Sequence, residues 1–191
     1  MCGRYSLFTE EEDRDIREII AEVSRKHPAA VVKTGEIFPT NTVPVLISGR
    51  SGLEAEPLVW GFPDFRNKGV VINARSETAA QKPMFRSSLL DRRCVIPTTG
   101  FYEWKKGASK QKYLFRMPGI NALYLAGFWN TFQGKPRYVI LTANANPSVA
   151  GIHNRMPVVL READRERWVR DTDWALDYMK TTLPGLESKT V

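Results

Sequence analysis

The feature that most constrains this chain is a long succession of short, strand-like apolar runs, each ended by proline, glycine or another turn residue. Runs of this length are typical of strands, and the segments between them are too short to hold crossover helices. The pattern therefore predicts an α+β domain built on a curved, mostly antiparallel β-sheet or open barrel with peripheral helices. The expected strands are residues 5–8, 43–47, 57–62, 70–73, 94–96, 101–105, 113–117, 122–129, 137–142 and 156–160.

Helix signals surround this series of strands. The segment from Thr9 to Glu12 matches a capping box, and apolar residues then recur at helical spacing from Ile16 to Val23. His27 and Pro28 end that pattern. The other expected helices run from a Ser76 cap to a point before Pro83, from Asn146 to Gly151, from Arg161 to Arg170 and from Trp174 to Lys180, with a polar tail from about residue 184.

The bulk properties narrow the class of protein. The chain has 191 residues, which predicts one domain spanning residues 1–191, and we expect a monomer. Its formal charge of +7, from 28 basic and 21 acidic side chains, favours a polyanionic partner, most commonly nucleic acid. No segment approaches the ~20 apolar residues of a membrane helix, and no hydrophobic signal core is present, so we expect a cytoplasmic protein with no membrane association.

The cysteines and histidines exclude two further classes. Cys2 and Cys94 are too few for a disulfide framework, and Cys94 lies in an apolar run where it is expected to be a buried small hydrophobe. The two histidines and two cysteines have unrelated spacings. They form no zinc pattern, so no metal and no cofactor is expected.

Cys2 offers a chemistry that depends on its place at the start of the chain. Once Met1 is removed, the α-amine and thiol of Cys2 form a 1,2-aminothiol. The amine of such a group forms an imine with an aldehyde, and the thiol then closes a thiazolidine ring. An α-amine titrates near ~8 and a thiol near ~8.5, so a modest depression of either pKa yields a reactive fraction at neutral pH. The alternative is that Cys2 is an incidental residue of a loose terminus.

Polar residues that end or interrupt the apolar runs are further candidates. Asn73 and Arg75 follow the run 70–72, where they are equally explained as a turn residue and a surface residue. Glu103 shares a strand face with Phe101. Its carboxyl is either solvated or partly buried, and in the second case it has a raised pKa and can pass protons. A lone histidine is more often structural than catalytic. His153, however, directly follows a short capped helix and precedes a strand, where side chains lie at the mouth of a sheet, and histidine carries protons well at neutral pH.

Basic and aromatic residues complete the set of candidates. Arg4, Arg75 and Arg155 are candidate phosphate contacts, and Trp60 is a candidate for stacking on an unpaired base. No spacing rule brings any of these residues together in space.

Short motifs connect the candidates. They are Met1–Tyr5, Trp60–Phe62, Asn73–Thr78, Lys82–Arg86, Arg92–Pro97, Gly100–Trp104, Leu141–Asn146 and His153–Pro157. In this combination and order the chain resembles the SRAP family, the SOS response-associated peptidase-like proteins. The family fold, a curved β-sheet domain with surrounding helices, agrees with the pattern of strands and helices above.

The resemblance implies covalent capture of abasic sites in single-stranded DNA, which protects the damaged strand. It implies that Cys2 forms a thiazolidine with C1′ of the opened sugar, in a cytoplasmic protein that is associated with the nucleoid when DNA is damaged. Asn73 would hold Cys2 and the sugar, Glu103 would act as general acid–base, and His153 would assist ring opening. The implied DNA-binding residues are Arg4, Arg75 and Arg155 for the phosphates, and Trp60 and Thr142 to line the site.

Two other functions stay open on the sequence. One is a cysteine peptidase or amidohydrolase of the N-terminal-nucleophile type, including self-removal of Met1, with Cys2 attacking an amide carbonyl. Such a site needs an oxyanion hole, for which the sequence has no signature. The other is a non-catalytic DNA-binding module, in which Cys2 is dispensable.

Overall fold

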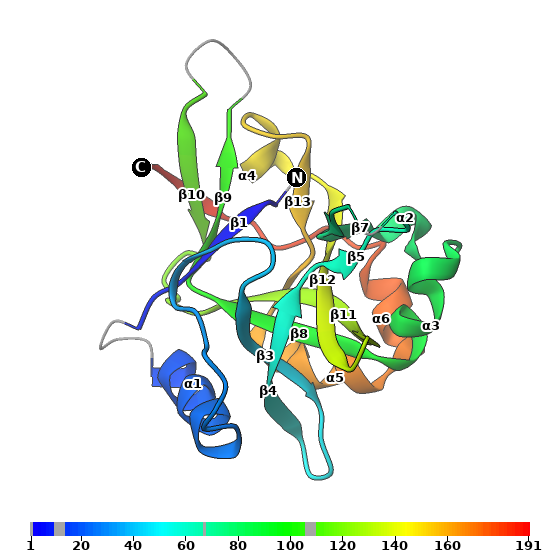
Figure 1. The fold of residues 1–191 in the computed structure, drawn as a ribbon. Coiled ribbons are helices and arrows are strands. Elements are labelled where there is room, and N and C mark those ends of the chain that lie inside the picture. The colour runs from blue at the N-terminus through cyan, green and yellow to red at the C-terminus, as the bar shows by residue number, and fades with distance from the viewer. Residues whose placement is uncertain (1, 10–13, 67, 106–109) are drawn as a thin grey trace.

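The centre of the fold is a β-barrel, seen in a computed structural model that describes residues 2–9, 14–66, 68–105 and 110–191 (Figure 1). Around the barrel the neighbouring strands pair antiparallel, except that β12 and β4 run parallel and close the ring. The α+β prediction is confirmed, and the sheet goes beyond an open barrel because this last pairing closes it. The barrel strands are β3 (Thr42–Ser48), β4 (Leu53–Trp60), β8 (Arg93–Thr98), β11 (Leu123–Phe132) and β12 (Lys135–Asn144).

The second half of β12 extends past the barrel and pairs with two short strands. There β7 (Asn73–Arg75) pairs in parallel, with Ile140 opposite Asn73, and β13 (Arg155–Pro157) pairs antiparallel. This extension brings Asn73 and the segment before β13, which contains His153, to the same end of the barrel. The remaining short strands are β5 (Phe62–Pro63), β6 (Val70–Val71) and β14 (Val159–Leu160).

A second antiparallel sheet carries the start of the chain. Its order is β15–β10–β9–β1–β2, so β1 lies between two other strands rather than at a free edge. The residues expected to form a polar tail are instead ordered as β15, which pairs with β10. The strands are β1 (Arg4–Leu7), β2 (Gly35–Ile37), β9 (Gly100–Trp104), β10 (Lys112–Arg116) and β15 (Glu187–Thr190).

The helices cover the outside of the barrel. Helix α1 (Arg14–Lys26) buries Ile16, Ile19 and Val23 against β3 and β4, as its spacing predicts, whereas most of the expected capping box lies outside the described residues. The short helix expected before Pro83 is present, but Arg75 rather than Ser76 occupies its cap position. Pro83 then begins a further helix that was not expected. The other helices are α2 (Ser76–Ala79), α3 (Pro83–Asp91), α4 (Pro147–Ala150), the 3-10 turn Glu162–Asp164, α5 (Arg165–Arg170) and α6 (Thr172–Tyr178).

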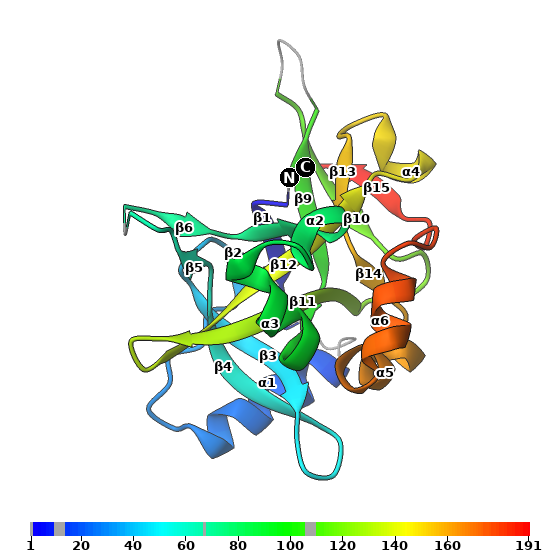
Figure 2. The same ribbon diagram turned by 90° about the vertical axis from the view of Figure 1, so that its right-hand side faces the viewer.

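The two ends of the barrel carry different elements. Strands β1, β9 and β13 lie in the upper half in both Figure 1 and Figure 2, whereas α1 and the turn between β3 and β4 lie at the bottom. Within the described part of the chain, no helix is long and apolar enough to cross a membrane. The candidate residues around Cys2 therefore belong to the upper end, opposite α1.

Candidate active site

Cys2 is anchored at the upper end of the barrel. It directly precedes Gly3 and strand β1, and it is fully buried. The side-chain amide of Asn73 donates a 2.8 Å hydrogen bond from Nδ2 to the Cys2 carbonyl oxygen. Because β1 is paired on both sides and Cys2 is held by this bond, the structure does not support a loose terminus.

The thiol of Cys2 lies close enough to Glu103 to be affected by its charge. Burial raises the pKa of the Cys2 thiol well above its ordinary value, and the Glu103 carboxylate raises it further. The direction is opposite to the depression considered from the sequence, so the thiol is protonated at neutral pH. Glu103 itself is only 3% exposed and shares the inner face of β9 with the buried Phe101. A buried carboxylate beside a neutral thiol is suited to accept the thiol proton during a reaction.

A tryptophan side chain fixes the backbone next to Asn73. The indole Nε1 of Trp60 donates a 3.0 Å hydrogen bond to the carbonyl oxygen of Ile72, the residue before Asn73. The Asn73 Oδ1 atom is buried and has no hydrogen-bond partner among the described residues. One end of the Asn73 amide therefore fixes Cys2, while the other end has an acceptor position left for an incoming donor.

His153 is oriented by the backbone of the strand that follows it. The Arg155 backbone nitrogen lies 3.0 Å from His153 Nδ1. The Arg155 carbonyl oxygen lies 3.2 Å from the same nitrogen, so the tautomer decides which of these two contacts is a hydrogen bond. In either tautomer the backbone of Arg155 fixes the orientation of the His153 ring.

Arg155 is a structural clamp at this end of the barrel. Its guanidinium forms a paired contact with the Glu77 carboxylate and donates to the Asn144 side chain at 2.8 Å and to the Thr142 carbonyl at 2.6 Å. Only 9% of the residue is exposed. In this conformation the Arg155 guanidinium joins α2, β12 and β13, and its expected contact with a DNA phosphate stays a prediction.

Comparison with known proteins agrees with the motifs. A family model described as SOS response associated peptidase (SRAP) matches residues 1–190. The chain belongs to the SRAP family. The resemblance drawn from the sequence motifs is thereby confirmed.

Several relatives of this SRAP chain are named as abasic site processing proteins. The abasic site processing protein YoqW of Bacillus subtilis is 33% identical over 199 residues, covering 96% of this chain and 86% of that protein. The abasic site processing protein YedK of Escherichia coli is 29% identical over 179 residues, covering 89% of this chain and 80% of that protein. A crystal structure of a Bacteroides thetaiotaomicron protein has a TM-score of 0.78 at 19% identity, covering 100% of this chain and 92% of that chain, which shows a shared fold.

Trp60 and Thr142 lie in the core of this SRAP protein. Its side chain is fully buried, with ring centroids 5.2 Å from Tyr5 and 6.4 Å from Tyr138, whose hydroxyl groups are 2.7 Å apart. A ring enclosed in this way has no face free to stack on a base. Thr142 is also fully buried, and its hydroxyl faces the Ala74 carbonyl at 3.4 Å. Both residues support the site from within the core.

Two other aromatic rings, those of Phe65 and Phe38, are exposed, and the sequence analysis did not single them out. Phe65 is 81% exposed between β5 and β6, with the Arg66 guanidinium 4.9 Å from its ring centroid. Phe38 is 40% exposed, and the Arg4 guanidinium lies 4.6 Å from its ring centroid. Arg75 is exposed where β7 meets α2. The signal available in the sequence was an aromatic beside an arginine in the short turn after Trp60.

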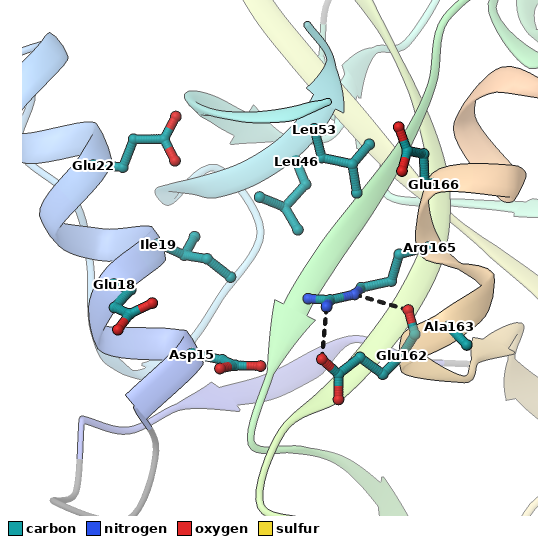
Figure 3. A pocket seen from close by; sticks show the side chains of 10 residues that line it. All are labelled: Asp15, Glu18, Ile19, Glu22, Leu46, Leu53, Glu162, Ala163, Arg165 and Glu166. Atoms are coloured by element: carbon teal, nitrogen blue, oxygen red, sulfur yellow. Dashed lines mark hydrogen bonds and ion pairs between the residues drawn. The ribbon is translucent and has the colours of Figure 1, made fainter. Parts of the chain in front are cut away.

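A cleft on the opposite side of the SRAP fold has a different character (Figure 3). It has a volume of about 510 Å³ between α1, the β3–β4 hairpin and α5. Each acidic side chain in its lining has a cationic or hydroxyl partner, so the cleft is a groove of local ion pairs. Among the described residues no cluster of three or more histidine, cysteine or acidic side chains could hold a metal ion. The lining residues are Asp15, Glu18, Ile19, Glu22, Leu46, Leu53, Glu162, Ala163, Arg165 and Glu166.

Proposed function

We propose that this protein captures abasic sites in single-stranded DNA through a covalent thiazolidine link made by Cys2 after Met1 has been removed. The names of its relatives support the processing of abasic sites. The observation that carries the proposal is the fixed position of Cys2, held by Asn73 beside the buried Glu103 carboxylate. This arrangement provides two nucleophiles and a proton acceptor at one point.

The proposed reaction begins with the sugar. Ring opening breaks the C1′–O4′ bond of the abasic deoxyribose: His153 gives a proton to the ring oxygen and takes back the proton that the C1′ hydroxyl loses, which leaves the C1′ aldehyde. The α-amine of Cys2 then adds to C1′, and loss of one water molecule leaves an imine. Asn73 Oδ1, the buried acceptor without a partner among the described residues, takes a hydrogen bond from the amine and directs its lone pair toward C1′.

Ring closure requires one proton transfer. The Cys2 thiol adds to the imine carbon, a C–S bond forms, and the electron pair of the C=N bond moves to nitrogen. Because the thiol pKa is raised, its proton leaves only as the bond forms; Glu103 accepts it and returns a proton to the ring nitrogen. The net change is aldehyde plus aminothiol giving thiazolidine plus water. Closure removes the hydrolysable imine, which favours a lasting adduct.

The strand is bound on a basic surface with exposed rings. Arg4 and Arg75 contact phosphates, and the exposed Phe65 and Phe38 replace Trp60 as stacking platforms. Stacking on separated bases favours a single strand over a duplex. The formal charge of +7 adds a general, salt-dependent attraction.

The test uses full-length protein whose loss of Met1 is verified by intact mass. It is incubated with a single-stranded oligonucleotide carrying one abasic site and run on a denaturing gel. We expect a shifted band whose mass is the sum of the two components minus one water molecule. Cys2→Ala should abolish the band, whereas Cys94→Ala, which removes the other buried thiol, should keep it.

Two controls make the result decisive. An oligonucleotide with a tetrahydrofuran analogue, which cannot open to an aldehyde, should give no adduct. The aminothiol mechanism is wrong if Cys2→Ala forms adduct as fast as the wild type.

Protein made without methionine aminopeptidase activity separates this proposal from the peptidase alternative, because a self-cleaving chain would still lose Met1.

A further inference from the structure

A glutamate bridges two cations on the outer face of the second sheet. Glu36 Oε1 lies 3.2 Å from Arg4 Nη1, and the Lys112 Nζ atom lies 2.9 Å and 3.0 Å from the two oxygens of the same carboxylate. The three side chains are 40%, 29% and 24% exposed for Arg4, Glu36 and Lys112. The cluster is therefore accessible from solvent, and Arg4 is only two positions from Cys2.

Strand register places this cluster on one face of the sheet. Arg4 is opposite Tyr102, Lys112 is opposite Trp104, and Glu36 is opposite Ser6. Since alternate residues of a strand share a face, Arg4, Glu36 and Lys112 all project from the same side. Glu103 projects from the other side, toward the barrel.

Aromatic rings hold both cations independently of Glu36. The Arg4 guanidinium lies 4.6 Å from the Phe38 centroid and 5.1 Å from the Trp104 centroid. The Lys112 ammonium lies 3.9 Å from the Tyr102 centroid and 5.7 Å from the Trp104 centroid. These contacts stabilise the positions of the cations, so the pair is pre-arranged even when the carboxylate moves away.

Such a pair is suited to an oxyanion ligand. Burial raises the pKa of Glu36, but the hydrogen bonds and positive charges of Lys112 and, to a smaller extent, of Arg4 lower it. The net result is a pKa below the ordinary value. The site is thus occupied by an internal anion at neutral pH. A phosphate group offers the same kind of oxygen acceptors to both cations.

We propose that Glu36 occupies a phosphate-binding site made by Arg4 and Lys112, and that a backbone phosphate of bound DNA displaces its carboxylate. The inference rests on the proposed function, since it takes DNA as the ligand. Its consequence is that Glu36 weakens binding of every polyanion, and a strand must replace an existing ion pair before it reaches Cys2.

The test measures non-covalent binding of a fluorescent single-stranded oligonucleotide without an abasic site, at several salt concentrations. Glu36→Gln should bind more tightly than wild type, with a salt dependence steeper by up to about 0.7 for the added phosphate contact. The matched control is Glu54→Gln. This glutamate also pairs with a lysine, Lys26 at 3.4 Å, and its removal changes the net charge equally. Glu54 is on β4, whose turn with β3 is at the bottom of Figure 1.

A lysine variant provides an independent result. Lys112→Gln should weaken binding and flatten the salt dependence, and the loss should be larger in the Glu36→Gln background, where the ammonium charge is not neutralised. The inference is overturned if Glu36→Gln binds no more tightly than Glu54→Gln, or if Lys112→Gln leaves binding unchanged. Thermal unfolding of each variant verifies that it is folded.

The two proposals fail in different ways. If the Cys2-dependent adduct forms but Glu36→Gln has no tighter binding, only the displaced phosphate site is wrong. If the wild type forms no adduct with abasic DNA, the proposed function is wrong, whatever the binding measurements show.

Discussion

Glu77 is the most informative single position for testing how the site is held together. Its carboxylate pairs with Arg155, whose side chain is only 11% exposed, and Arg155 in turn positions His153 through its backbone. Glu77→Gln keeps the shape and one acceptor oxygen but removes the charge. The Arg155 guanidinium is then left largely buried without a counter-ion.

The size of the effect follows from the exposures. Removing one partner of a fully buried ion pair costs about 3–5 kcal/mol. Glu77 is 43% exposed, so solvent screens the pair, and Gln retains a hydrogen bond. We therefore expect a loss of roughly 1–2 kcal/mol, which for a chain of this length lowers the melting temperature by roughly 2–8 °C.

The loss should also depend on pH. The hydrogen bonds from Arg155 lower the Glu77 pKa below its ordinary value of 4.5, against the opposing effect of burial. A carboxyl with a depressed folded pKa adds stability above its unfolded pKa and loses it as pH falls through the folded value. The gap between wild type and Glu77→Gln should be full at neutral pH and should shrink below about 4.5.

The assay is thermal or denaturant unfolding across this pH range. Glu162→Gln is the matched control, because its partner Arg165 is 21% exposed and Glu162 itself is 60% exposed. Such a surface pair should contribute less than about 0.5 kcal/mol. The reasoning is refuted if the two variants are equally stable at neutral pH, or if the Glu77→Gln gap stays constant in acid.

Two further outcomes are expected. Asn73→Ala removes the hydrogen bond to the Cys2 carbonyl, and a buried acceptor left unpaired costs about 1–3 kcal/mol. Adduct formation, timed on denaturing gels, should therefore slow roughly 5- to 100-fold. An unchanged rate would contradict the role of this bond. Gly100→Ala should destabilise the protein by about 1–3 kcal/mol in urea, because φ is +151° there and a Cβ would lie 2.7 Å from the Phe115 carbonyl oxygen. Gly134→Ala, at φ +75° with nothing within 4 Å of its Cβ, should lose less.

The fold class followed from the sequence because it depends on local pattern. Short apolar runs joined by short turns favour antiparallel neighbours, as in the pairs β3–β4 and β11–β12. The pairs β3–β8 and β8–β11 are also antiparallel although their strands are far apart in the chain, whereas β12 and β4 are parallel. That closing pair was beyond prediction, since it joins strands far apart in the chain. The polar residues of β15 were read as a tail because they are exposed, and it is their backbone pairing with β10 that orders them.

The site was less predictable, because its members meet through long-range contacts. Asn73 and Cys2 are 71 positions apart and Arg155 and Glu77 are 78 apart, so no spacing rule relates them. The direction in which Trp60 points could not be predicted, because the sequence of an apolar run does not show whether a tryptophan at its end faces the core or the solvent. Here it faces in, against Tyr5 and Tyr138. The family resemblance, rather than periodicity, was what joined the residues around Cys2.

The central place of β1 has a consequence for biosynthesis. Cys2 is made early in synthesis, whereas Asn73, which bonds its carbonyl oxygen, and Tyr102, which pairs with Arg4, are made much later. Pairings between such distant segments form slowly, because a large loop must close before they contribute stability. The nascent chain therefore exposes its leading thiol long before the groups that would control it exist. Under the proposed function, the site around Cys2 can be complete only after Glu103 has been added, when more than half of the polypeptide has been made.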